Sequence, residues 1–101
     1  MSAGRKFDQG KLQWWLLPIT PVEAIIRVLM FGAKKYAPNN WQKIENAEER
    51  YFDAALRHLM AWRQGEKYDP ESGHSHLAHA GCCILFMLWF EIHRCGKKTH
   101  G

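Results

Sequence analysis

The sequence of 101 residues lacks the features that mark several large classes of protein. Its three cysteines are an odd number, which predicts a reducing compartment and no disulfide framework. No apolar run precedes Asp8, so we expect no signal peptide. The longest apolar stretch, residues 77–90, is shorter than the roughly 20 residues that a bilayer span needs, and it contains His79. We therefore expect a cytoplasmic protein with no membrane partner.

Strong charge of one sign is also missing. The net charge is +4 and the pI about 9.1, but the chain has no dense run of lysine and arginine of the kind found in nucleic-acid-binding arms. We expect no specific nucleic-acid partner, whereas a mild positive charge suits a small anionic ligand. The sequence contains no internal repeat, and its length fits a single domain over residues 1–101.

Apolar residues, in contrast, are abundant. They make up 47% of the chain and include five tryptophans, which is more apolar surface than a monomer of this size easily buries. We therefore expect a homodimer or homotetramer in which a partner completes the core. Residues 1–19 are expected to form an N-terminal arm whose apolar block, residues 12–17, packs on a neighbour or forms a strand. Residues 96–101 are expected to be a frayed tail.

Apolar residues at helical spacing predict three helices and an all-α fold. The first helix is expected to begin at Thr20, a capping residue that Pro21 and Glu23 follow at favourable positions, and to fade near Tyr36. Its apolar face consists of Val22, Ile25, Ile26, Leu29 and Ala33.

The second helix is expected to begin near Ala47 and to end at Gly65, and the third to follow a cap at Ser72 or Ser75. The expected core stripe of the second helix is Phe52, Ala55, Leu56 and Leu59. The opposite side carries Arg50, Asp53 and Arg57, and the flank between them carries Tyr51, His58 and Trp62. The third helix is apolar nearly all round, which predicts burial on all sides and again a partner subunit.

A polar loop, residues 65–73, joins the second and third helices beside most of the histidines. His76 and His79, one turn apart, can ligate zinc together with Cys83, which follows one turn later. Ordinary hydrogen-bonded histidines at a helix start are the simpler alternative. The turn formed by residues 69–73 either holds a ribose or a basic group, or only caps the helix.

Carboxylates that hold magnesium for nucleotide hydrolysis usually occur in groups. Here only Glu49 and Asp53 are spaced to share a helix face, and Asp53 suits an ion pair with Arg57 equally well. Arg50 and Arg57 lie two turns apart, about 10 Å along the axis, and can bracket a di- or triphosphate or merely face solvent. The aromatic residues that can stack on a base, or else pack in the core, are Trp41, Tyr51 and Trp62.

Several short strings of residues, in this order, resemble a phage-encoded family. They are Asp8-Gln9-Gly10-Lys11, Leu16-Leu17-Pro18, Phe31-Gly32-Ala33-Lys34-Lys35-Tyr36, Asn40-Trp41, Arg57-His58, Asp69-Pro70-Glu71-Ser72-Gly73 and His76-Leu77-Ala78-His79-Ala80. The family is the dATP/dGTP diphosphohydrolase N-terminal domain, related to the MazG-like nucleotide pyrophosphohydrolases, and the resemblance extends over residues 6–92.

The resemblance implies a MazG-like all-α fold that assembles as a dimer or tetramer. It also implies that a purine deoxynucleoside triphosphate is cleaved between its α and β phosphates with the help of magnesium or manganese. MazG-like enzymes carry E-x-x-E on one helix and E-x-x-D on the next, whereas this chain has His76-x-x-His79 and, on the preceding helix, Glu49 and Asp53. The alternatives are a protein of the same fold that sequesters a nucleotide, such as a host-defence signal, and a zinc-stabilised interaction module.

For a hydrolase we predict three groups of site residues. The metal ligands are Glu49, Asp53, Glu71, His76 and His79, and the catalytic residues are Asp53, His58 and Glu71. The residues that bind the purine nucleotide are Lys34, Lys35, Tyr36, Asn40, Trp41, Arg50, Arg57, Trp62 and Asp69. Mg²⁺ or Mn²⁺ is the expected cofactor, ahead of Zn²⁺.

Overall fold

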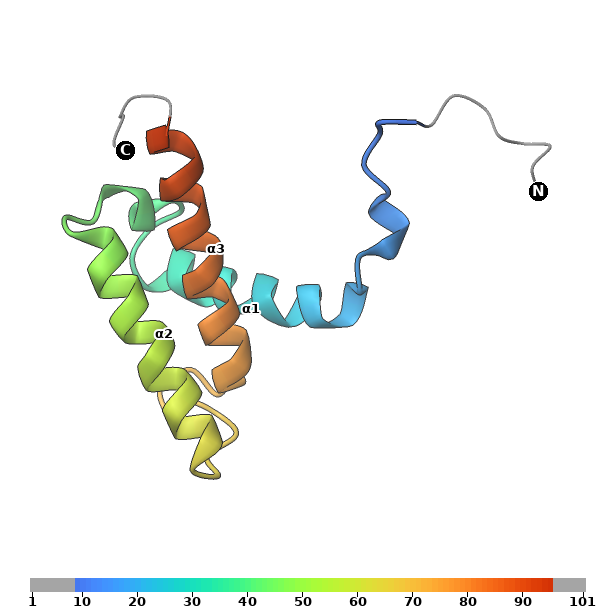
Figure 1. Cartoon of the computed structure of the whole chain (residues 1–101). Coiled ribbons are helices and arrows are strands. Elements are labelled where there is room, and N and C mark those ends of the chain that lie inside the picture. The colour runs from blue at the N-terminus through green and yellow to red at the C-terminus, as the bar shows by residue number, and fades with distance from the viewer. Residues whose placement is uncertain (1–8, 96–101) are drawn as a thin grey trace.

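Three α-helices dominate the computed structural model, which describes residues 9–95 (Figure 1). They are α1 (Ile19–Lys35), α2 (Ala47–Arg63) and α3 (His76–Cys95), and two short 3₁₀ helices, η2 (Trp14–Leu16) and η3 (Asn40–Lys43), precede α1 and α2. The described residues form no strand beyond one isolated bridge between Tyr68 and Ser75. The predicted all-α fold with three main helices is confirmed.

The ends of α1 follow from proline and charge. The helix begins at Ile19, directly after the extended Pro18, so the prediction that Thr20 caps it is wrong. Pro21 lies in the first turn, where a missing N–H group costs no helical hydrogen bond. At the other end, Lys34 and Lys35 occupy the last turn, where positive charge complements the helix dipole.

Residues with left-handed backbone set the limits of α2. Asn46, with φ of 54°, precedes the first residue of the helix, and asparagine is among the few residues that adopt this conformation readily. Gly65, with φ of 105°, follows the end of the helix and turns the chain away. Both limits agree with the sequence-based prediction.

The turn between α2 and α3 is held by its own polar groups. The Asp69 carboxylate accepts a hydrogen bond from the Ser72 backbone N–H at 3.0 Å, and Gly73, with φ of 78°, closes the turn. Ser75 then caps α3, since its hydroxyl oxygen accepts a hydrogen bond from the Leu77 N–H at 3.0 Å. Of the two predicted caps, Ser75 is therefore the correct one.

Helix α3 is the central element of the fold. It lies beside α2 along much of its length, and α1 crosses it on another side (Figure 1). Small residues make the close approach possible, because a methyl group on Gly81 would lie 2.9 Å from Ile25 Cδ1 of α1. The core between α1 and α3 is built around Val28, Ala78 and Cys82.

A large part of the apolar surface stays outside this core. On α2, Phe52 is 53% exposed and Leu56 43% exposed, so the prediction that both belong to the core is wrong for the single chain, although Ala55 is buried as expected. The flank with Tyr51 and His58 is the side of α2 that is partly buried. On α3, Ile84, Leu85 and Leu88 are exposed in the single chain, so the predicted burial of this helix on all sides still depends on the predicted partner subunit.

The N-terminal arm contributes further exposed apolar surface. Its described part, residues 9–18, extends away from the three helices (Figure 1), and Leu12, Trp14, Trp15 and Leu16 in it are 61–79% exposed. By length and composition His76–Arg94 in α3 also matches a membrane span, with a mean hydropathy of 1.2. One such helix is weak evidence for a span, and 28% of this window is buried inside the chain, where α3 packs against both other helices.

Candidate functional site

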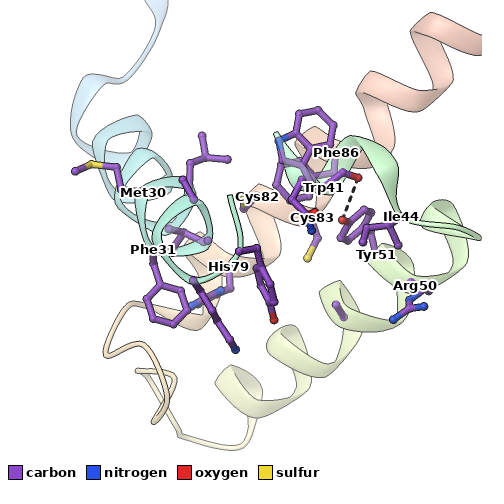
Figure 2. Close-up of a pocket in the computed structure, with 18 of the residues that line it drawn as sticks. Met30, Phe31, Trp41, Ile44, Arg50, Tyr51, His79, Cys82, Cys83 and Phe86 are labelled. Atoms are coloured by element: carbon purple, nitrogen blue, oxygen red, sulfur yellow. Dashed lines mark hydrogen bonds between the residues drawn. The ribbon is translucent and has the colours of Figure 1, made fainter. Parts of the chain in front are cut away.

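A cleft of about 1060 Å³ opens between α1 and α2, with α3 at its base. Figure 2 shows Phe31 and His79 at one end, and Trp41 and Phe86 at the other. The buried thiol-bearing residues of α3 lie between these two ends. The end with Trp41 and Phe86 is called the aromatic end and the end with Phe31 and His79 the ionisable end, although Arg50 also lies beside Tyr51 at the aromatic end (Figure 2).

Stacked aromatic rings form the wall at the aromatic end of the cleft. Trp41, which η3 positions, stacks on Phe86 of α3 with ring centroids 4.2 Å apart and an interplanar angle of 11°. Tyr51 of α2 packs edge-on against Phe86 at 5.0 Å, and its hydroxyl donates a hydrogen bond to the Trp41 carbonyl at 3.2 Å. Burial raises the pKa of Tyr51, so this hydroxyl stays protonated as the donor. These contacts fix the 3₁₀ helix against the helical core.

Cationic side chains line the cleft from two helices. Arg50 and Arg57 come from α2, with Asp53 between them in sequence, and Lys35 comes from the end of α1. The Lys35 ammonium donates a hydrogen bond to the Glu71 carboxylate in the turn before α3, and this bond is the main reason that the pKa of Lys35 is raised. The described residues include no ion-pair partner for Asp53 or for either arginine.

Two histidines face one another beside the ionisable end of the cleft. His58 Nδ1 from α2 and His76 Nδ1, on the first residue of α3, are 2.8 Å apart. His76 Nε2 lies 2.8 Å from Glu66 Oε1, which fixes the proton on Nε2 as the donor to this carboxylate. At neutral charge, His76 Nδ1 is then the acceptor, and His58 Nδ1–H donates to it. Only 3% of His76 is exposed.

A second polar group adjoins this pair. The His79 ring stacks on the His58 ring at 4.5 Å, and His79 Nε2 lies 2.7 Å from Ser72 Oγ and 4.0 Å from the Asp69 carboxylate. Burial lowers the pKa of His58 and of His79, so both imidazoles are neutral near pH 7. Burial alone would raise the pKa of Asp69, but the hydrogen bonds from Ser72 and the nearby His79 outweigh it and lower that pKa.

Most of the site residues predicted from the sequence line the cleft, and the other four lie elsewhere. Those that line it are Lys35, Tyr36, Asn40, Trp41, Arg50, Asp53, Arg57, His58, Asp69, Glu71 and His79. Glu49 instead borders a smaller cavity of about 470 Å³ beside Glu48 and Arg94. Lys34 and Trp62 are exposed outside the cleft, and His76 contacts His58 without lining it.

The predicted sets of metal ligands do not come together. Among the described residues, one group of three has ligand atoms within 4.8 Å of one another, and it consists of His58, Asp69 and His76. Glu49 and Cys83 are not part of it, and burial raises the pKa of the Cys83 thiol to about 11. No group of three carboxylates forms within this part of the chain, so a magnesium site made only of protein carboxylates does not fit.

Sequence analysis missed three contributors to the site. Phe31 lines the cleft but lies outside the predicted apolar face of the first helix, and Phe86 lies on the third helix, where apolar residues on nearly all sides do not distinguish a wall residue from a core residue. Glu66 is a charged residue in a polar loop, and its contact with His76 depends on the path of the turn. The one sequence signal for Glu66 is that a functional histidine often has a carboxylate partner that orients its ring.

Comparison with known proteins places the chain in a family. Residues 1–100 match the family described as "dATP/dGTP diphosphohydrolase, N-terminal". The chain is 38% identical over 91 residues to a protein of Salmonella phage PMBT28 named "dATP/dGTP diphosphohydrolase", which covers 90% of this chain but 31% of the phage protein. No solved structure matches. The family match extends over nearly the whole sequence, and the chain belongs to the dATP/dGTP diphosphohydrolase N-terminal family.

Proposed function

We propose that the cleft binds a purine deoxynucleoside triphosphate, which is hydrolysed there to the monophosphate and pyrophosphate. The observation that carries this proposal is the composition of the cleft, whose lining combines the aromatic rings of Trp41 and Phe86 with the cations Lys35, Arg50 and Arg57. A nucleotide needs both surfaces, because its base is flat and apolar and its phosphates are anionic. The name of the similar phage protein supports this class of substrate, although the chain spans less than a third of that protein.

The contacts suggest how the nucleotide lies. One face of Trp41 is covered by Phe86, and the rings of Trp89 and Phe90 also pack against Trp41, so a base stacks against the part of this wall that is left open to the cleft. The phosphates then extend along α2, where Arg50 and Arg57 are two helical turns, about 10 Å, apart. Guanidinium groups bind phosphate oxygens through paired hydrogen bonds and stabilise the charge that develops on the leaving pyrophosphate.

Two side chains suit the hydrolytic step in this arrangement. His58 lines the cleft as a neutral imidazole, and it can accept a proton from the water that attacks the α phosphate as the bond to the β phosphate breaks. Asp53 is exposed in the cleft between the two arginines in sequence. A magnesium ion is often held by one or two carboxylates together with substrate phosphates, so Asp53 can hold an ion that neutralises the triphosphate.

The test is incubation of the purified chain with each deoxynucleoside triphosphate and Mn²⁺, followed by assay of pyrophosphate and monophosphate. We expect both products from dATP or dGTP, and at least tenfold less from the Asp53→Ala variant, which loses a charge-assisted contact worth about 1.5–3 kcal/mol. The Glu91→Ala variant removes an exposed carboxylate outside the cleft and serves as the control. Intact nucleotides in every reaction would contradict hydrolysis by this chain.

A second function is favoured by one observation. Because the described residues gather no carboxylate cluster, the cleft is better equipped to grip phosphates than to hold several metal ions. A protein that sequesters a purine nucleotide, for example a host-defence signal, needs only these contacts to the phosphates and no metal cluster. Tight binding of a nucleotide without release of pyrophosphate would identify this function in the same experiment.

We also propose that a second copy of the chain covers the exposed apolar surface. The arm with Trp15 and the α2 stripe with Phe52 and Leu56 leave large side chains in solvent, which a stable monomer seldom does over so much of its surface. Sedimentation should therefore detect a dimer or tetramer. The Leu56→Glu variant should dissociate, while Arg63→Glu, a charge change at an exposed polar site of the same helix, should not. A monomeric parent chain at micromolar concentration would contradict this proposal.

A further inference from the structure

We propose that His58, Asp69 and His76 form a binding site for one transition-metal ion, with zinc as the preferred ion. The three residues come from α2, from the turn and from the first position of α3, and each offers a ligand atom within 4.8 Å of the others. Two imidazoles and one carboxylate are a ligand set that suits zinc, whereas magnesium prefers oxygen ligands alone. This site differs from the predicted sets built on Glu49 or Cys83.

The backbone holds the ligands in place before any ion binds. The His76 N–H donates a hydrogen bond to the Lys67 carbonyl at 2.9 Å, and the Asp69 N–H donates to the His74 carbonyl at 2.8 Å. Together with the bond from the Ser72 N–H to the Asp69 carboxylate, these contacts fix both ends of the turn. The ligands therefore converge on rigid supports, which lowers the entropic cost of binding an ion.

Glu66 gives His76 the orientation that a metal ligand requires. A histidine that donates one ring N–H to a carboxylate directs the lone pair of its other nitrogen toward the ion, and such a carboxylate is a common partner of metal-binding histidines. His76 shows this arrangement, with Nε2 at 2.8 Å from Glu66 Oε1 and Nδ1 facing His58 Nδ1 at 2.8 Å. For zinc to bind both Nδ1 atoms, the His58 proton has to move to Nε2, so His58 can accept a proton from water only while the metal site is empty.

Only a small adjustment of the two rings is required. With zinc–nitrogen bonds of about 2.0–2.1 Å and tetrahedral angles, two ligating nitrogens lie roughly 3.3 Å apart. The His58 and His76 nitrogens, now 2.8 Å apart, would separate by roughly half an ångström. His58 is only half-buried and can move by that amount without disturbing the core.

The site borders the nucleotide cleft without depending on it. His58 and Asp69 both line the cleft, so the fourth coordination position faces it or is taken by His79, which lies 4.0 Å from the Asp69 carboxylate. Three protein ligands with a fourth position open to a water or a ligand are typical of catalytic zinc sites. A bound anion, such as a phosphate group, is the kind of ligand that this position would take.

The test uses the full-length, tag-free chain after treatment with a chelator, with no nucleotide present. Titration with Zn²⁺ alone, followed by calorimetry, should show one ion per chain, and Mg²⁺ alone should show none at the same concentrations. The Asp69→Asn and His58→Gln variants should lose this binding. Glu66→Gln, which alters only the residue that orients His76, should weaken it roughly 10- to 100-fold. His93→Gln, an exposed histidine near the end of α3, is the matched control.

The outcomes separate a metal site from a network of hydrogen bonds. Absence of stoichiometric zinc binding by the folded parent chain would overturn the proposal, and so would equal loss of binding in His93→Gln and His58→Gln. Substitution of Co²⁺ for Zn²⁺ adds a spectroscopic readout, because its visible absorption should change in Glu66→Gln if His76 is a ligand. Since no nucleotide is used, a negative result leaves the proposal for the cleft standing and refutes only this one.

Discussion

His76 is a buried polar residue whose replacement should clearly destabilise the fold. Among the described residues it is the one polar side chain in the buried class, and it makes hydrogen bonds to both His58 and Glu66. Replacement by leucine removes two hydrogen bonds worth about 0.5–1.5 kcal/mol each and leaves His58 without its partner. We expect a loss of about 2–4 kcal/mol in the free energy of unfolding, or roughly 10–20 °C in Tm for a chain of this size.

The assay is urea denaturation followed by circular dichroism, at one fixed protein concentration and with a chelator present so that no metal contributes. Glu66→Gln is the comparison, because its side chain is largely exposed and glutamine still offers an oxygen to the His76 N–H. We expect this variant to lose less than about 1 kcal/mol. If His76→Leu unfolds within about 0.5 kcal/mol of the parent chain, the hydrogen bonds do not contribute as the structure indicates.

Further predictions concern the helix contacts. Burial raises the pKa of Cys82 to about 12 and that of Cys83 to about 11, so alkylation of both thiols at pH 8, followed by mass spectrometry, should be at least about 100-fold slower in the native than in the unfolded chain. Equal rates would show that α3 opens freely. Gly81→Leu should separate α1 from α3 at Ile25 and cost about 1–3 kcal/mol in urea denaturation, while Gly81→Ala should cost less because the end of the Ile25 side chain can rotate. Equal stability of Gly81→Leu and the parent chain would contradict the close crossing.

The helices were accessible from sequence because their limits depend on local chemistry. Gly65 ends α2 through a left-handed backbone, and Ser75 caps α3 with its own hydroxyl, so neither signal requires tertiary structure. The start of α1 was misplaced because Thr20 and Pro21 also imitate a cap and a first helical residue, while Pro18 provides the actual boundary.

The core was harder to predict than the helices. Phe52 and Leu56 lie at helical spacing like any core stripe, but in the single chain they face solvent, and α2 turns Ala55, Tyr51 and His58 inward instead. Periodicity reports only that a face is apolar. Whether that face packs on its own chain or on another copy depends on how the helices are arranged around α3.

In the site, too, the sequence identified residues but not the contacts between them. The motif strings singled out His58, Asp69 and His76, but helical spacing joined His76 with Cys83, because both lie on one face of a straight helix. The structure instead joins His76 with His58, which is distant in sequence, through the fold of the turn. Contacts across a turn depend on backbone path, and no pairwise spacing encodes that path.

The most direct test of the central claim is the affinity of the cleft for purine nucleotides. Calorimetric titration of the parent chain with dATP, dGTP and dCTP should show tighter binding of a purine. Arg57→Ala, which removes a cation from the cleft, should weaken that binding roughly tenfold or more, since a charge-assisted bond to phosphate contributes about 1.5 kcal/mol or more. Arg63→Ala, which removes an exposed cation outside the cleft on the same helix, should leave the affinity unchanged. Equal losses in the two variants, or no binding by the parent chain, would contradict a nucleotide site in this cleft.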